Sequence, residues 1–203
     1  MRAFIARYVA PLDSSRPRGA RLIEAFSPKL GRRLQLFDLH SFAQWIRLEV
    51  DPSVRAFCER PVRLGPQADS HLIDFWVQRD DAQAMLLLRS DHVEHVPTTV
   101  CEVPVRPVTG AELAAASVWV SNWSRMLPVL IAAQPLVSKA LQQSVVRHVG
   151  QPMSLAHAEH DLSVGDPSLV RGAIFELLRT GRLNAPSLHV APLSLHTMLE
   201  PMP

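Results

Sequence analysis

The segment from Phe37 to Asp91 constrains the fold of this chain more than any other. It contains one amphipathic stretch and three extended stretches that short polar turns separate. A helix is predicted over Phe37–Glu49, because apolar residues recur there every three to four positions. Asp38 is well placed to cap its first turn, and Asp51-Pro52 ends it, since the residue before a proline avoids the helical region. A helix that leads into successive strands predicts a mixed α/β fold.

Three strands are predicted after this helix. Val54–Leu64 is interrupted by a proline and suits an edge strand. His71–Val77 and Met85–Arg89 are joined by a polar turn and form a predicted hairpin. The second of these is apolar throughout, which indicates burial on both faces. Because residues two apart share a face of a strand, Asp74 and Arg89 are expected to face one cleft.

The remaining segments complete a three-part organisation: a basic arm over residues 1–36, an α/β domain over 37–120 and a helical domain over 121–203. A further strand is predicted over Val100–Val108. A helical stretch over Pro128–Val149, interrupted at Pro135, precedes a strong helix start at Asp166-Pro167. Short strand-like pieces follow Leu183. Helices followed by a short hairpin are the outline of a winged helix.

Positive charge is concentrated near the N-terminus. Residues 1–33 hold eight arginines and lysines against two acidic residues, whereas the whole chain has a formal charge of only +2. A segment of this kind can follow a phosphate backbone, so the candidate DNA contacts here are Arg16, Arg18, Arg32 and Arg33. The alternative is that these arginines are simply solvated.

Cysteine content and hydropathy indicate a cytoplasmic protein. Only Cys58 and Cys101 occur, and neither a disulfide framework nor a CxxC metal site is present. No apolar run reaches the length of a membrane span. We therefore expect a reduced environment and no membrane partner.

The order of these segments resembles that of a known family. "LEVDPSVRAFCERPV", "HLIDFWV" and "MLLLRSD" resemble, in this order, the N-terminal domain of TnsA-type transposon endonucleases, which belong to the PD-(D/E)xK nucleases. The resemblance continues through "VPVRPVTGAEL", "SNWSRMLPVL" and "GDPSLVRGAIFELLRTGRLNAPSLHVAPLS" and covers about residues 37–200. It implies a restriction-endonuclease-like mixed sheet flanked by helices. It also implies Mg²⁺ as cofactor, transposon-end DNA as substrate and a TnsB-like transposase subunit as partner.

The catalytic motif departs from the family pattern. The resemblance assigns Asp74 as a metal ligand, Asp38 as a second candidate ligand and Arg89 as the cation that holds phosphate. However, Leu87 stands where the family has an acidic ligand, and Arg89 replaces a lysine. One carboxylate seldom holds magnesium by itself, unless Glu59, Glu94 or Glu102 takes the place of the missing ligand.

These departures leave three hypotheses. The preferred one is a catalytically degenerate module that binds DNA and docks a transposase in DNA transposition. The second is an active Mg²⁺-dependent endonuclease that cuts the 5′ ends of the transposon. The third is a nuclease-like component of a phage-defence system. Leu87 favours the first.

Two further groups of residues are candidates for binding. Arg171, Arg179 and Arg182 lie on or just after the helix that starts at Asp166-Pro167, where they would contact DNA phosphates or serve a protein-docking domain. The pairs His157/His160 and His92/His95 have a spacing that suits one metal on a helix. Each pair lacks an evident third ligand in the sequence.

Overall fold

A computed structural model describes residues 6–65, 67, 70–88, 96–163 and 166–202. The chain divides into two compact units. The first contains residues 1–49 and 53–115, and the second contains residues 50–52 and 116–203. The second unit thus begins at Ala116, where we expected a second domain from residue 121. The segment predicted as an arm belongs to the first unit.

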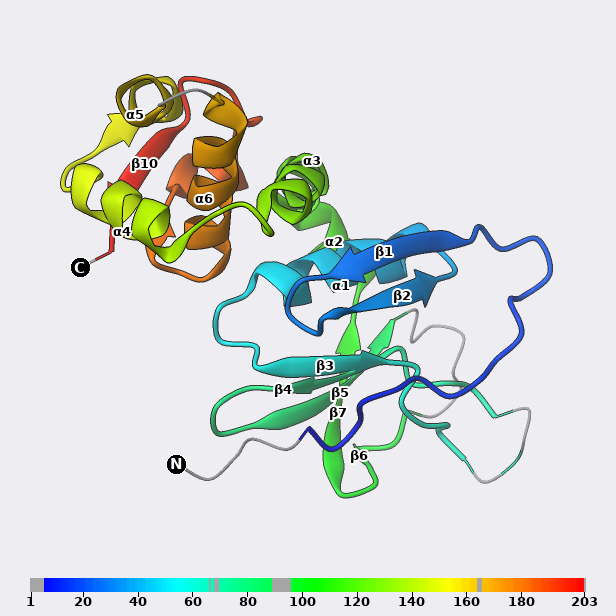
Figure 1. Ribbon diagram of the computed structural model, residues 1–203. Coiled ribbons are helices and arrows are strands. Elements are labelled where there is room, and N and C mark those ends of the chain that lie inside the picture. The colour runs from blue at the N-terminus through cyan, green and yellow to red at the C-terminus, as the bar shows by residue number, and fades with distance from the viewer. Residues whose placement is uncertain (1–5, 66, 68–69, 89–95, 164–165, 203) are drawn as a thin grey trace. The chain divides into compact units, whose positions relative to one another are not determined.

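The first unit is built on a five-stranded mixed sheet with strand order β3-β4-β5-β7-β6. Its strands are β3 (Ala56–Glu59), β4 (Phe75–Gln78), β5 (Gln83–Leu88), β6 (Thr99–Val100) and β7 (Val103–Val108). Neighbouring strands pair antiparallel, except that β5 and β7 are parallel. The unit also contains hairpin β1 (Ile23–Ser27) and β2 (Arg32–Leu36) with helices α1 (Leu39–Val50) and α2 (Gly110–Ala115) (Figure 1). The mixed α/β class is therefore confirmed.

The predicted order of one helix and three strands is confirmed. Asp38 caps α1, since its carboxylate accepts hydrogen bonds from the Ser41 amide at 2.8 Å and the Ser41 hydroxyl at 3.0 Å. Strand β3 lies at the edge of the sheet and β5 at its centre. Met85–Leu88 are buried, as the continuous apolar run predicted.

The hairpin β1–β2 was not predicted, because its arginines were interpreted as part of an irregular arm. Leu34 and Leu36 are nevertheless buried in alternation with exposed Arg33 and Gln35, which is the pattern of a half-buried strand. Gly31 adopts a φ of 66° in the turn, where glycine has no steric cost. The hairpin is held to the last turn of α1 by buried Glu49. Its carboxylate accepts hydrogen bonds from the Ser27 hydroxyl at 2.5 Å and from the Lys29 amide at 2.9 Å.

One face of the sheet is covered by the N-terminal segment. Buried Cys58, Trp76 and Met85 form a cluster on that face, and Ala6 and Tyr8 pack against it. The Tyr8 and Trp76 rings meet edge to face with centroids 5.4 Å apart. The segment before β1 is therefore part of the packed fold.

The second unit combines helices with a three-stranded antiparallel sheet of order β8-β10-β9. Its elements are α3 (Ser117–Ala133), α4 (Lys139–His148), β8 (Met153–Ser154), α5 (Leu155–Leu162), α6 (Pro167–Arg179), β9 (Leu183–Asn184), η2 (Pro186–His189) and β10 (Met198–Pro201). The break near Pro135 and the Asp166 cap of α6 are confirmed. The prediction that a helix starts at Pro128 was wrong, since Pro128 lies inside α3.

Helix α3 is tied closely to the rest of the second unit. Gly172 of α6 faces Ala133 of α3 so closely that an added Cβ would lie 2.3 Å from the Ala133 Cβ. Buried Asn122 of α3 fixes the loop before β10 by donating to Leu188 O at 2.8 Å and Ala191 O at 2.9 Å. Its side-chain oxygen accepts from the Leu193 amide at 2.8 Å. Within the described residues, no helix is both long and apolar enough to cross a membrane.

Candidate functional site

Asp74 lies immediately before β4 and beside Leu87. Its amide donates to Leu86 O at 3.1 Å, and its carboxylate accepts from the Leu88 amide at 2.6 Å. These two hydrogen bonds reach the residues on either side of Leu87 in β5, so Asp74 lies next to Leu87. Leu87 has an exposed fraction of 0%, so the position that the resemblance assigns to a second ligand holds a core side chain.

Of the other predicted catalytic residues, Asp38 is described and Arg89 is not. The Asp38 carboxylate serves as the helix cap of α1. Arg89 lies outside the described residues, as do His92, Glu94 and His95. Among the residues that the structure describes, no group of three or more histidines, cysteines, aspartates or glutamates is arranged to hold a metal ion. The magnesium site at Asp74 stays a prediction.

Glu59, a candidate replacement ligand, instead belongs to a buried ion pair. Its carboxylate receives two hydrogen bonds from the Arg32 guanidinium, at 2.7 and 2.6 Å, and the residue is 1% exposed. The hydrogen bond to Glu59 raises the pKa of Arg32. Burial raises the pKa of neighbouring Cys58 to about 12. This pair joins β2 to β3 and uses one of the arginines predicted to contact DNA.

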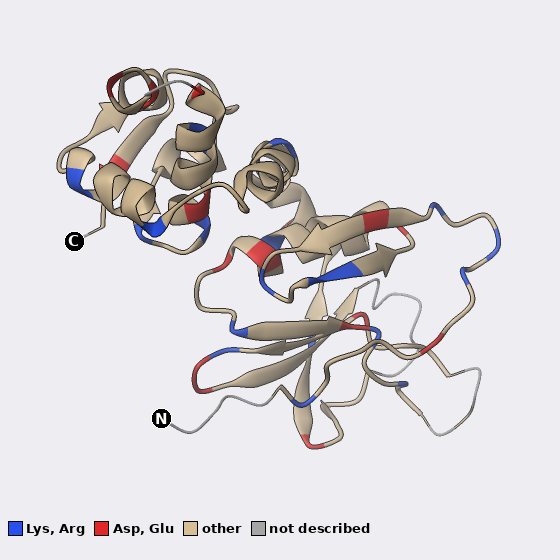
Figure 2. Ribbon diagram, in the orientation of Figure 1, with Lys and Arg blue, Asp and Glu red and all other residues tan. Residues whose placement is uncertain are grey.

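The arginines predicted to contact DNA fall into two groups. Arg171 makes a bidentate pair with Glu159 at 2.5 and 2.7 Å, and Arg179 makes one with Glu176 at 2.8 and 2.6 Å. Exposed side chains are found at Arg16, Arg18, Arg33 and Arg182. Figure 2 shows the cationic residues of the segment before β1 and at the start of β2. DNA contact stays a prediction for all of them, and the exposed group is better placed for it.

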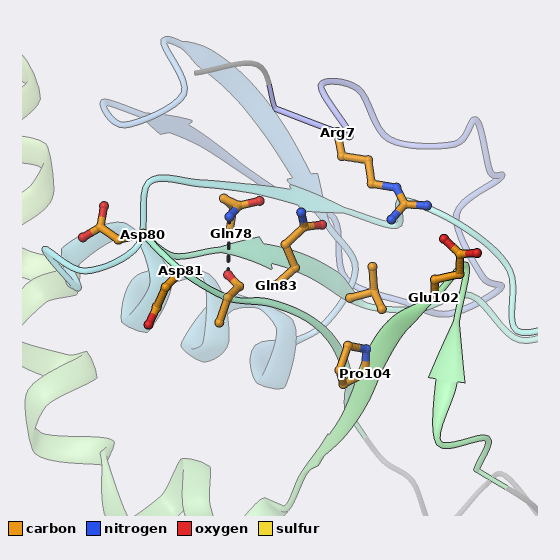
Figure 3. Close-up of a pocket in the computed structure, with 9 residues that line it drawn as sticks. Arg7, Gln78, Asp80, Asp81, Gln83, Glu102 and Pro104 are labelled. Carbon is orange, nitrogen blue, oxygen red and sulfur yellow. Dashed lines mark hydrogen bonds between the residues drawn. The ribbon is translucent and has the colours of Figure 1, made fainter. Parts of the chain in front are cut away.

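Glu102, a second candidate replacement ligand, lines an open depression of about 500 Å³ in the first unit. Arg7 and Glu102 lie at one end of it, and Asp80 and Asp81 lie at the other (Figure 3). Asp80 is paired with Arg55, whose hydrogen bond lowers the pKa of Asp80. Neither Asp74 nor Asp38 lines this depression. Sequence reasoning missed it because three segments distant in the sequence line it: Arg7, the turn between β4 and β5, and the turn between β6 and β7.

His157, one member of the candidate pair with His160, lies close to an aspartate. His157 Nε2 lies 3.2 Å and His148 Nε2 lies 3.0 Å from the same Asp161 oxygen. The three residues thereby join the end of α4 to α5. The signal that sequence reasoning missed is the four-residue spacing of His157 and Asp161, which places them on one face of a helix.

A smaller pocket of about 270 Å³ lies in the second unit. Its lining comes from α3, α5, α6 and the loop before β10: Arg125, Val129, Leu155, Arg171, Phe175, Leu193, Ser194 and Leu195. Because Arg125 and Val129 are four residues apart on α3, they lie on the same side of that helix. Nothing in the sequence alone indicated that these elements meet.

No protein-family profile matches this chain, and no curated protein is significantly similar to it in sequence. The chemistry that the described residues offer is therefore the direct guide to function. Around Asp74 they offer one carboxylate that is already hydrogen-bonded to the backbone, with a buried leucine beside it.

Proposed function

We propose that this chain is a TnsA-like subunit of a heteromeric transposase in DNA transposition, in which catalysis is lost and DNA binding and transposase docking remain. The observation that carries this proposal is the burial of Leu87 next to Asp74. A magnesium ion in a nuclease needs several oxygen ligands. An aliphatic side chain in the core supplies none.

The position of Asp74 supports the loss of catalysis. One of its carboxylate oxygens accepts the Leu88 amide at 2.6 Å. This hydrogen bond ties Asp74, immediately before β4, to the backbone of β5. The carboxylate therefore satisfies a backbone amide. This hydrogen bond gives Asp74 a structural role that requires no metal ion.

The architecture of the second unit supports a binding role. The order α4, β8, α5, α6, β9, β10, with β10 between its two partner strands, suits a winged helix. Winged helices bind DNA or dock proteins. The ion pairs of Arg171 and Arg179 leave these two guanidiniums less available for phosphate, which favours docking for this unit and DNA contact for the first.

The test compares wild type with Asp74→Asn, which keeps an acceptor for the Leu88 amide. Calorimetric titration with Mg²⁺ and Mn²⁺ is expected to show no saturable binding to either protein. Duplex DNA is expected to bind without being cut, both alone and with a candidate transposase subunit. Saturable metal binding that Asp74→Asn removes, accompanied by nicking, would establish an active endonuclease and overturn the proposal.

A further inference from the structure

The pocket of the second unit has an apolar floor of limited size. Phe175 and Leu155 are buried at its base, Val129 and Leu193 are half-buried, and Leu195 is 52% exposed at its edge. Small-molecule sites usually measure about 300–1,000 Å³. A volume of about 270 Å³ is close to the lower limit of that range and has room for a single bulky apolar side chain.

The charge beside this floor is positive. Arg171 lines the pocket, but Glu159 balances its charge through two hydrogen bonds. Arg125 is exposed, and no hydrogen bond or ion pair of its guanidinium is found within the described part of the chain. Among the described residues, Arg125 is therefore a cation without an acidic partner, and it lines the apolar pocket.

This charge pattern does not suit nucleic acid. DNA binding depends on several cations that each neutralise a phosphate. Residues 183–203, which supply the loop wall of the pocket and strand β10, contain no lysine or arginine. A single arginine beside an apolar hollow instead matches one carboxylate beside one apolar side chain.

The walls of the pocket are joined to one another by hydrogen bonds within the second unit. Asn122 holds the loop to α3, with its side-chain oxygen 2.8 Å from the Leu193 amide. The amides of Leu155 and Ala156 donate to Thr197 O at 2.8 Å and Leu195 O at 2.9 Å, which holds the loop to α5. A preformed site loses little conformational entropy on binding.

We propose that this pocket docks a segment of a partner polypeptide in which a bulky apolar residue is adjacent to an aspartate or glutamate. The apolar side chain fills the hollow over Phe175, and the carboxylate pairs with Arg125. The inference rests on the proposed docking role and specifies the chemistry of the docked segment.

The test selects binders from a random peptide display library on the full chain and measures their affinity by fluorescence anisotropy. Enriched peptides are expected to carry Leu, Ile, Met or Phe next to Asp or Glu. Arg125→Glu is expected to weaken them about tenfold, since an attractive pair becomes a repulsive one. Leu195→Asp is expected to weaken them as well.

Arg147→Glu, which changes an exposed arginine of α4 outside the pocket, is the matched control and is expected to have no effect. Circular dichroism melting checks that each variant folds.

The most informative experiment reverses the charge at position 125 and repeats the peptide selection. Selection on Arg125→Glu is expected to enrich Lys or Arg beside the apolar residue. The proposal is overturned if no sequence is enriched, if the enriched peptides lack an acidic residue, or if their binding survives Arg125→Glu. It is also overturned if Arg125→Glu weakens duplex DNA binding, which would make the pocket a nucleic-acid contact. The proposed function is tested separately by metal titration and DNA cleavage. A failed peptide selection would therefore contradict only the docking inference.

Discussion

At the scale of single residues, the Arg32–Glu59 pair joins two strands of the first unit through a buried carboxylate. Its carboxylate is buried, and its two hydrogen bonds are short. Removing one partner of a buried pair leaves an uncompensated charge, which typically costs about 3–5 kcal/mol. We therefore expect Glu59→Gln to lower the free energy of unfolding by about 3 kcal/mol in urea titrations.

The matched control for this prediction is Asp80→Asn, which breaks the exposed Arg55–Asp80 pair. Exposed pairs contribute little because water and salt screen them. The urea midpoint of Asp80→Asn should stay close to that of wild type. If both variants lose the same free energy of unfolding, the Arg32–Glu59 pair stabilises the fold no more than an exposed pair does, and the prediction is wrong.

The two thiols provide a second test at this scale. Burial raises the pKa of Cys58 to about 12, whereas Cys101 is exposed. The thiolate is the reactive form, so a thiol reagent at pH 8 should modify one cysteine in the folded protein and two in denaturant. Cys101→Ser should abolish the rapid reaction. Two fast thiols in the native protein would contradict the burial of Cys58.

The same thiol predicts a pH dependence of stability. A raised pKa in the folded state means that the unfolded chain loses the proton first as pH rises. The contribution of Cys58 is therefore fully present below its ordinary pKa of 9.0 and is lost between about 9 and 12. Cys58→Ala should flatten this alkaline loss in urea titrations across that range.

At the scale of elements, the sequence predicted features that depend on residues close together along the chain, such as strands and helix caps. The apolar run of β5 and the Asp38 cap of α1 were both read correctly. The hairpin β1–β2 was missed although Leu34 and Leu36 alternate with polar residues, because charge dominated the interpretation of that segment. Pro128 was read as a helix start, yet α3 continues through it, since tertiary packing outweighs a local preference.

The close approach of α3 and α6 gives a prediction of its own. An added Cβ at Gly172 would lie 2.3 Å from that of Ala133, so Gly172→Ala must separate the helices. Overpacking of this kind typically costs about 1–3 kcal/mol, which thermal unfolding would detect. The double variant Gly172→Ala/Ala133→Gly should recover most of the loss.

Gly150→Ala is the matched control, because its new Cβ would meet only Arg147 O at an ordinary 3.6 Å. Its melting temperature is expected to stay near that of wild type. A similar drop for both single variants would indicate a backbone effect of glycine replacement in place of a steric one.

At the scale of the whole molecule, the candidate sites depend on side chains that the sequence alone does not bring together. Arg171 reads as a phosphate contact until Glu159 is placed beside it. Arg125 was not a candidate binding residue in the sequence analysis. The structure shows that it lines a pocket together with residues of α3, α5 and α6. Charge in a sequence gives the number of cations, but only the fold shows which of them are already paired.

This distinction predicts which arginines would form the proposed DNA contact. Each phosphate contact contributes about 0.9 to the slope of log K against log salt concentration for duplex DNA. Arg16, Arg18 and Arg33 are exposed in the first unit, so replacing all three with alanine should reduce the magnitude of the slope by up to about 2.7. Fluorescence anisotropy with a labelled duplex over a series of salt concentrations measures this change. Arg55→Gln removes one exposed cation that already pairs with Asp80 and should leave the slope nearly unchanged. If the triple variant keeps the wild-type slope, Arg16, Arg18 and Arg33 do not contact phosphate, and this prediction is wrong.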